Sequence, residues 1–293
     1  MAVLKVINLD RTKPESTFLL RSARNVYSQT GEDGILERLF ELVGCENKWC
    51  VEFGAWDGIH LSNTCHLIRD KGWNALLIEG NAEKANELKA NFADNPKVVA
   101  MNSIVGFTEG IDTLDVHLSR ASLPADFDFL SIDVDGNDHH IWESMRDYRP
   151  RVVCVEYNPM IPNDVVFIQD RDMRVNQGSS LAALIELGRS KGYELVCATR
   201  FNGIFVQSEL FARVGIADNS IDAMRANVTG RIFGTYDGTL YNHTGRLTNQ
   251  GQGLQPERRQ FQILSRHQRR FGDSLNGGGG LHAIASSILG RRG

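Results

Sequence analysis

Short apolar runs, separated by amphipathic segments, organise most of this chain. The runs cover residues 49–53, 75–79, 98–101, 128–133 and 151–156. The segments between them carry apolar side chains at spacings of three and four, which is the period of an α-helix. A parallel sheet covered by helices on both faces produces this pattern, because its central strands are buried on both sides. The pattern therefore predicts an α/β fold.

Two later runs predict how the sheet ends. Residues 193–198 and 203–206 are apolar, and the turn-like sequence Thr199-Arg-Phe-Asn-Gly separates them, as in a β-hairpin. Together with the five earlier runs they predict a mostly parallel seven-stranded sheet with an antiparallel edge hairpin. Residues 113–118 alternate weakly between apolar and polar side chains, and we expect them to form a further edge strand.

The remaining stretches divide the chain into three parts. Residues 1–26 form an N-terminal segment with mixed signals, residues 27–213 hold the predicted domain, and residues 214–293 form an extension rich in Gly, Asn and Arg. The run Gly277 to Gly280 predicts that the extension is partly flexible. Within the domain, residues 159–178 are polar and turn-rich, and a loop of that length is usually a lid or a substrate loop.

The turn after the first apolar run is the best candidate for a ligand site. Gly54 and Gly58 bracket it, and glycine permits a positive φ and a close approach of backbone to a ligand. Their spacing is not that of a dinucleotide fingerprint or a P-loop. The next run ends in Glu79, and an acidic residue at this place accepts hydrogen bonds from a ribose. A ribose without a required pyrophosphate favours S-adenosylmethionine, whereas the alternative is an ordinary turn and a surface glutamate.

Composition and charge narrow the class of protein. The chain has 293 residues, of which 42% are hydrophobic, and its formal net charge is −4. That charge gives no reason to expect nucleic acid or a membrane surface as partner. No apolar run approaches the roughly 18 residues of a membrane-spanning helix. The start lacks a signal-peptide pattern, and the five cysteines form no C-x-x-C pair, so we expect a cytoplasmic protein.

The last part of the chain is locally basic. From residue 251 onward there are seven Arg against two acidic residues. Phe261 and Leu264 have the spacing of a helix that would carry several of these arginines. Such a face would suit an anionic partner, or the contact of a homo-oligomer, and the alternative is a solvated tail.

Several ordered motifs run through residues 27–211. They are Ser28-Gln29-x-Gly31-Glu32-Asp33, Glu52-x-Gly54-Ala55-x-Asp57-Gly58 with Ser62-Asn63-Thr64, Glu79, and Ser131-Ile132-Asp133-Val134-Asp135-Gly136-Asn137-Asp138. In this order the chain resembles the FkbM-type S-adenosylmethionine-dependent methyltransferases. The resemblance implies a Rossmann-like class I methyltransferase fold. Gly80 departs from the pattern, because many methyltransferases have proline or another residue there.

The resemblance also implies which residues bind the cofactor. The glycine-rich corner would wrap the methionine and ribose portions, and Glu79 would bind the ribose hydroxyls. Ser103 and Ile104 would flank the adenine, and Asp133 would lie near the methyl-bearing sulfonium. The other implied cofactor residues are Gln29, Glu52, Gly54, Ala55, Asp57, Gly58 and Asn63.

Acidic and imidazole side chains at the ends of two neighbouring runs are the candidates for catalysis. Methyl transfer from a sulfonium depends on positioning, and an acceptor hydroxyl must also lose its proton. We expect Asp133, Asp135 or His140 to take that proton. Asp133 and Glu156 also offer the oxygen ligands that Mg²⁺ prefers. The alternative is that the segment around Asp135 only forms a turn and a helix cap.

Three functions are compatible with the sequence. The favoured one is O-methylation of a hydroxyl on a small molecule, with a sugar or glycan acceptor suggested by the resemblance alone. The second is a non-catalytic protein that keeps the fold and binds the cofactor. A nicotinamide-dependent oxidoreductase is the third, and the missing third glycine of the dinucleotide fingerprint argues against it.

Overall fold

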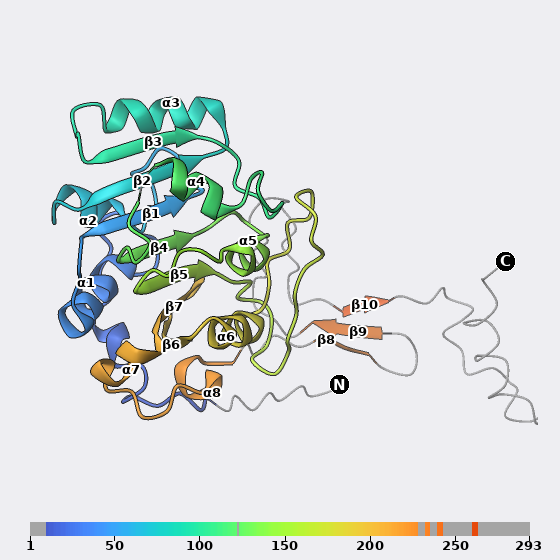
Figure 1. The fold of residues 1–293 in the computed structure, drawn as a ribbon. Helices are drawn as coiled ribbons and strands as arrows, with labels where there is room; N and C mark the ends of the chain where they lie inside the picture. The colour runs from blue at the N-terminus through green and yellow to red at the C-terminus, as the bar shows by residue number, and fades with distance from the viewer. Residues whose placement is uncertain (1–9, 122, 228–231, 235–238, 243–259, 263–293) are drawn as a thin grey trace, which may run out of the picture. The chain divides into compact units, whose positions relative to one another are not determined.

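A seven-stranded sheet forms the centre of the first part of the chain (Figure 1). The chain divides into two units, Met1–Val228 and Thr229–Gly293, and each has a sheet of its own. The structure is a computed structural model, and it describes residues 10–121, 123–227, 232–234, 239–242 and 260–262.

The strand order of the large sheet defines its fold. The strands are β1 (Trp49–Phe53), β2 (Asn74–Glu79), β3 (Val98–Asn102), β4 (Phe129–Ile132), β5 (Val152–Glu156), β6 (Tyr193–Ala198) and β7 (Asn202–Gln207). They are arranged as β3-β2-β1-β4-β5-β7-β6, and β7 runs antiparallel to both of its neighbours. This is the Rossmann-like class I methyltransferase fold. The predicted seven-stranded sheet with an antiparallel hairpin at its edge is therefore confirmed.

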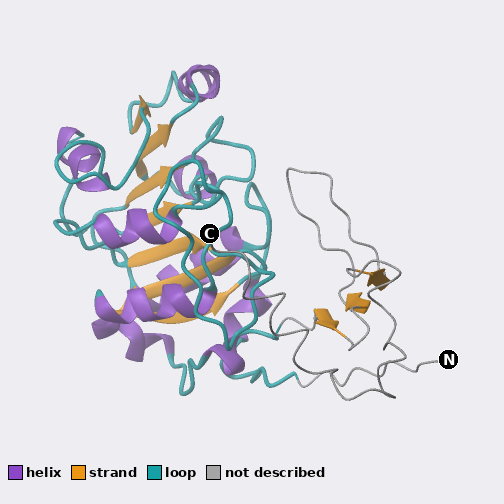
Figure 2. Ribbon diagram, turned by 90° about the vertical axis from the view of Figure 1, so that its right-hand side faces the viewer, coloured by secondary structure: helices purple, strands orange, loops and turns teal. Residues whose placement is uncertain are grey.

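Helices cover both faces of this sheet (Figures 1 and 2). They are η1 (Phe18–Ser22), α1 (Glu32–Val43), α2 (Cys65–Arg69), α3 (Ala82–Asn91), α4 (Leu114–Arg120), α5 (Asp138–Ser144), α6 (Leu181–Ser190), α7 (Ser208–Val214) and α8 (Ile221–Met224). Helix α5 packs beside α6, and α1 packs against η1 and α7. Among the described helices, none is both long and apolar enough to cross a membrane.

Burial along the strands follows from this two-sided cover. Every residue of β4 and β7 is buried, whereas the edge strand β3 has only half-buried and exposed positions. Under α5 and α6, the Trp142 ring lies 5.1 Å from Phe205 and 5.8 Å from Tyr193, measured between ring centroids. This aromatic core fixes α5 on the sheet, and α5 begins directly after the loop that follows β4.

The structure corrects the expected strand at residues 113–118. Residues Leu114–Arg120 form helix α4, and Leu114, His117 and Leu118 are its buried side chains. These positions have the helical spacing of three and four, so the weak alternation was a helical stripe. Helix α1 begins directly after Gly31, its N-cap, which has a positive φ of 99°.

Residues outside the predicted domain limits take part in the first unit. Leu19 is fully buried in the core. The Lys13 N–H donates to the Ala223 carbonyl at 2.9 Å, and the Ser16 hydroxyl donates to the Asp218 carbonyl at 2.6 Å. The segments on either side of residues 27–213 are thus hydrogen-bonded to each other.

The second unit contains an antiparallel sheet in the order β10-β9-β8. Its strands are β8 (Ile232–Gly234), β9 (Thr239–Asn242) and β10 (Gln260–Gln262). Phe261 therefore lies in a strand, and the expected helix through Phe261 and Leu264 is wrong at this position. Leu264 and the linker at residues 277–280 lie outside the described residues.

Candidate functional site

The corner between β1 and α2 is shaped by positive φ angles. Gly54 has φ 71°, Trp56 has φ 51° and Gly58 has φ 76°. A Cβ on Gly54 would lie 1.7 Å from the Asp133 carbonyl oxygen, and one on Gly58 would lie 2.4 Å from Leu88 Cδ1. Both glycines are thus required by the packing of the chain itself. This reason is independent of the expected approach of a ligand to the backbone.

Glu52 holds the same corner from within the core. Its buried carboxylate accepts hydrogen bonds from the Ser62 hydroxyl at 2.6 Å, the Asn63 N–H at 2.8 Å and the Thr64 hydroxyl at 2.7 Å. Burial raises the pKa of Glu52, although these three hydrogen bonds oppose that shift. The structure therefore gives Glu52 the role of fixing residues 62–64.

Glu79 ends β2 beside this corner. Its Oε2 accepts the Trp56 N–H at 2.8 Å, and its Oε1 accepts the Asn81 N–H at 2.7 Å. These two bonds orient the buried carboxylate. An ionised carboxylate has about four acceptor positions, so two further donors can still be accepted. That is the capacity that the two hydroxyls of a ribose need.

The ends of β2 and β3 bring the other predicted cofactor residues to Glu79. The Ser103 N–H donates to the Glu79 carbonyl at 3.1 Å. Ile104 is 63% exposed, and a Cβ on Gly80 would lie 3.3 Å from its Cγ1. Glycine after Glu79 therefore leaves room for an exposed apolar side chain next to a carboxylate. A flat apolar ring and a diol would find complementary groups here.

The remaining predicted cofactor residues differ in their exposure. Gln29 is exposed, whereas Ala55 and Asn63 are buried. The Asn63 amide donates to the Ser131 hydroxyl at 3.1 Å and so links the corner to β4. The Asp57 carboxylate accepts backbone N–H groups of the next turn at 2.9 and 2.7 Å. Asn63 and Asp57 thus have structural partners within the chain.

A cluster of three carboxylates lies at the ends of β4 and β5. Oxygen atoms of Asp133, Asp135 and Glu156 lie within 4.8 Å of one another. Burial and the charges of Asp138 and Asp135 raise the pKa of Asp133 to about 8, and burial with the charges of Asp133 and Asp138 raises that of Glu156 to about 10. At neutral pH this cluster therefore needs a proton or a cation, and its oxygen donors suit Mg²⁺.

The acidic residues of the loop between β4 and α5 have two different roles: one caps the backbone of the loop, and two belong to the carboxylate cluster. Asp138 is buried and accepts the backbone N–H groups of Val134 and Gly136, each at 2.9 Å. Its burial raises its pKa to about 6. Asp135 has a φ of 55°, which is unusual for a residue other than glycine. The turn-and-cap role thus belongs to Asp138, and it leaves Asp133 and Asp135 in the carboxylate cluster.

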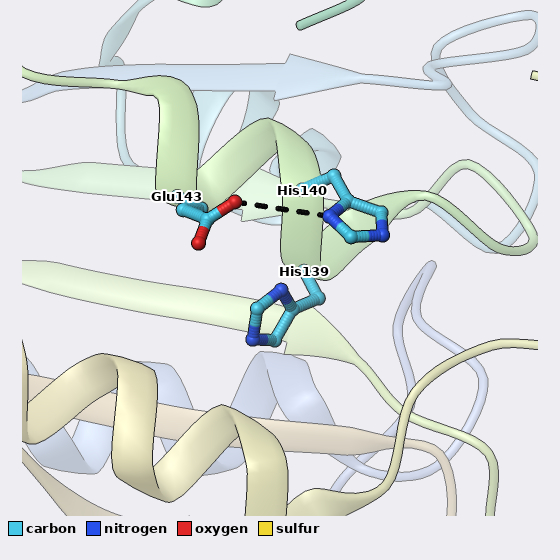
Figure 3. A group of neighbouring side chains, drawn as sticks. All are labelled: His139, His140 and Glu143. Atoms are coloured by element: carbon cyan, nitrogen blue, oxygen red, sulfur yellow. Dashed lines mark ion pairs between the residues drawn. The ribbon is translucent and has the colours of Figure 1, made fainter. Parts of the chain in front are cut away.

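His140 belongs to a different group of side chains (Figure 3). The structure brings it together with His139 and Glu143 on α5 rather than with the three carboxylates. Its Nε2 lies 2.8 Å from the carbonyl oxygen of Gln169. Among the three predicted bases, Asp133 and Asp135 therefore share one cluster, and His140 is in another.

Glu143 was missed by the sequence reasoning. It follows His140 by three residues and His139 by four, and on a helix these spacings place side chains on one face. That spacing is the signal that would have found it.

The segment of residues 159–178 packs over the β4–α5 loop. A Cβ on Gly136 would lie 3.0 Å from the Val175 carbonyl oxygen, and the Asn137 amide donates to that same oxygen at 3.4 Å. Gln169 is 1% exposed, and its side chain accepts two backbone N–H groups of the same segment at 3.0 and 2.9 Å. The segment is thus an ordered loop beside the carboxylate cluster, and its role as a lid stays a prediction.

Glu32 is a second residue whose role the sequence reasoning did not anticipate. It is fully buried and accepts the Thr30 N–H at 2.8 Å, the Thr199 hydroxyl at 2.7 Å and the Asn202 amide at 3.1 Å. Asn202 is paired with Glu156 across β5 and β7. Glu32 therefore ties the start of α1 to the hairpin next to the carboxylate cluster.

The strand order gives the chain a class I methyltransferase fold. Its candidate site has an acidic residue at the end of β2 and a cluster of three carboxylates at the ends of β4 and β5. No family profile matches this chain, and no curated protein matches it.

Solved structures resemble it in fold. The O-methyltransferase from Bacillus cereus in complex with SAH is 17% identical, with 62% of this chain and 82% of that chain covered and a TM-score of 0.39. An S-adenosylmethionine-dependent methyltransferase from Clostridium acetobutylicum is 8% identical, with 60% and 90% covered and a TM-score of 0.39. The CMeT domain of the citrinin polyketide synthase is 13% identical, with 60% and 51% covered and a TM-score of 0.40. The chain thus spans about half the length of that last structure. The strand order β3-β2-β1-β4-β5-β7-β6 of this chain defines its fold.

Proposed function

We propose that this chain is an S-adenosylmethionine-dependent methyltransferase of the FkbM type, which methylates a hydroxyl on a small molecule, sugar or glycan. The observation that carries the proposal is the Glu79 carboxylate, held at 2.8 Å by the Trp56 N–H beside the exposed Ile104. It lies at the carboxyl end of β2, and ligands of open α/β sheets bind at such ends. We assign the activity to residues 27–213 of a cytoplasmic protein.

The cofactor contacts follow from that position. Glu79 would accept hydrogen bonds from both ribose hydroxyls, and a charged acceptor makes these bonds stronger than neutral ones. Ile104 would pack against the adenine, and Ser103 would lie at its edge. The backbone of the Gly54 corner would contact the methionine part, because the corner lies at the carboxyl end of β1, where ligands of open α/β sheets bind.

The carboxylate cluster would deprotonate the acceptor. An ordinary aspartate is a weak base at neutral pH, and a base works best when its pKa lies near the operating pH. Burial and the charges of Asp138 and Asp135 raise the pKa of Asp133 to about 8, which brings it into that range. The same carboxylates and Asp135 have the donor set for Mg²⁺, and such an ion would lower the pKa of an acceptor hydroxyl.

Two measurements test the proposal. Calorimetric titration of the full chain should give saturable binding of S-adenosylmethionine and no binding of NAD. Incubation with methyl-labelled cofactor and a panel of hydroxylated small molecules and oligosaccharides should give a labelled methyl ether, detected by mass spectrometry. NAD binding would favour an oxidoreductase instead. Cofactor binding without turnover on any acceptor would favour a binding protein.

A further inference from the structure

Three side chains of α5 form a cluster of metal-ligating groups outside the proposed methyl-transfer site. His139, His140 and Glu143 each offer one ligand atom, and these atoms lie within 4.8 Å of one another (Figure 3). The distance between His140 Nδ1 and Glu143 Oε2 is 3.8 Å. The cluster shares no residue with the group of Asp133, Asp135 and Glu156.

The hydrogen bond of His140 fixes which of its ring nitrogens is free. Its Nε2 lies 2.8 Å from the Gln169 carbonyl oxygen, and a carbonyl can only accept. The proton of the neutral ring is therefore on Nε2, and Nδ1 has a free lone pair directed toward Glu143. Histidine ligands of metals commonly donate their other N–H to a backbone carbonyl in this way, because the bond orients the ring and raises its basicity.

Both histidines have a buried nitrogen without a hydrogen bond. His139 is 4% exposed and His140 is 7% exposed, and the Nδ1 atoms of both have no partner among the described residues. A buried polar atom without a partner is costly and is expected to have a compensating ligand. Two such nitrogens from adjacent residues, with a carboxylate within reach, indicate a ligand that accepts lone pairs.

We propose that His139, His140 and Glu143 bind a Zn²⁺-type divalent transition-metal ion. Two imidazole nitrogens and one carboxylate oxygen are a donor set that such ions take, with a fourth position left for water or another ligand. Tetrahedral ligands at roughly 2.0–2.1 Å from zinc lie about 3.4 Å apart. The His140–Glu143 pair at 3.8 Å is close to that separation, and the other two pairs, which lie within 4.8 Å, exceed it by at most about 1.4 Å.

Arg171 is the competing partner of Glu143. Its guanidinium lies 3.7 Å from Glu143 Oε2, and it also donates to the Phe107 carbonyl at 3.0 Å. Glu143, Arg171 and Phe107 line a cavity of about 730 Å³, so an ion at Glu143 can exchange with solvent. A bound ion would hold α5 to the loop of residues 159–178 through His140 and the Gln169 carbonyl.

Zinc binding to the full chain tests the proposal. After removal of metal, Zn²⁺ is titrated in competition with a chromogenic chelator, and the bound zinc is counted by elemental analysis. Wild-type protein and a D133N/E156Q variant should both keep this site, because it does not use the carboxylate cluster. E143Q and H140Q should each raise the Kd for Zn²⁺ at least tenfold. D147N removes another acid that lines the same cavity and should change the Kd by less than twofold.

The environment of the bound metal gives a second measurement. Co²⁺ in place of Zn²⁺ should give the visible absorption of a four-coordinate site in wild type and not in E143Q. The R171Q variant removes the competing cation and should bind Zn²⁺ more tightly. Circular dichroism checks the folding of each variant, and the exposed position of Glu143 keeps E143Q informative if H140Q is unstable. If wild type binds no Zn²⁺, or if E143Q and R171Q bind it as wild type does, Glu143 only pairs with Arg171 and the proposal fails.

Discussion

The carbonyl oxygen of Asp133 lies 1.7 Å from the point where a Cβ on Gly54 would be. The end of β4 therefore occupies the space beside the corner of β1, and only glycine fits between them. The ligand corner and the first residue of the carboxylate cluster are thus in direct backbone contact. A side chain at position 54 should therefore displace the backbone at Asp133.

We expect Gly54→Ala to lower the free energy of unfolding by more than about 2 kcal/mol, because it adds a backbone clash to a positive φ. Gly44→Ala is the matched control. Gly44 has a φ of 78° but no atom within 4 Å of its Cβ position, so that variant should lose only about 1–2 kcal/mol. Urea unfolding measures both. Equal losses in the two variants would contradict the close contact with Asp133.

We expect Glu79→Gln to weaken S-adenosylmethionine binding by roughly 1.5–3 kcal/mol, because the ribose loses a charged acceptor. Calorimetry measures this change, and thermal unfolding checks that the Trp56 and Asn81 contacts still hold the strand end. The control is Glu83→Gln, which neutralises an exposed acid of α3 and should leave the Kd unchanged. An unchanged Kd in Glu79→Gln would remove the ribose assignment.

We expect Glu156→Gln to stabilise the protein more at pH 8 than at pH 5. Burial and the charges of Asp133, Asp138 and Asp135 raise the pKa of Glu156 to about 10, so the folded state holds a proton that the unfolded state releases above about pH 4.5. Wild-type stability therefore falls as pH rises from there toward 10. The amide has no proton to release, and its advantage should grow by on the order of 1 kcal/mol or more.

Denaturant unfolding at the two pH values measures this effect. Glu186→Gln neutralises an exposed glutamate of α6 and is the control for a change of net charge alone. A pH-independent difference between Glu156→Gln and wild type would mean that the carboxylates do not share a proton.

We expect exhaustive treatment with EDTA to separate two forms of catalysis. If the carboxylate cluster works through Mg²⁺, turnover should disappear and return when Mg²⁺ or Mn²⁺ is added. If Asp133 alone takes the proton, full activity should remain after metal removal, and Asp133→Asn should abolish it. We favour the metal-free result, because a raised pKa already makes Asp133 an effective base. Cofactor affinity, measured in parallel, should not depend on metal.

We expect Gln169→Ala to impair the acceptor and not the cofactor. Loss of this buried amide releases three hydrogen bonds within the loop of residues 159–178, so the loop should become mobile. The acceptor KM should rise several-fold, and the Kd for S-adenosylmethionine should stay constant. Arg174→Ala alters an exposed side chain of the same loop and is the control. Unchanged kinetics in both variants would make the loop a surface insertion.

The sheet could be predicted from the sequence because its strands are buried on both faces. A strand such as β4 then reads as an unbroken apolar run, and its neighbours follow from the alternation of strands and helices. Helix α4 could not be predicted in the same way. Its seven residues give only two turns, and over so short a length the periods of a helix and a strand overlap.

Site residues were predictable where strand ends determine their position. Asp133 and Glu156 end adjacent strands, so their proximity follows from topology. Hydrogen-bond partners do not follow from it. Glu52 and Asp138 are acidic residues of the kind that bind ligands, but their carboxylates accept hydrogen bonds from the chain itself. These donors come from neighbouring turns whose geometry no residue pattern specifies.

The contacts of Glu32 have a consequence for the order in which the protein is made. Its partners Thr199 and Asn202 lie 167 and 170 residues further along the chain. When α1 of a nascent chain has left the ribosome, the Glu32 carboxylate therefore lacks these two hydrogen-bond partners until the β6–β7 hairpin has emerged. We expect nascent chains that end before Thr199 to remain sensitive to protease and full-length chains to resist it. Closure of this domain is thus a late event of translation, completed by the last hairpin of the sheet.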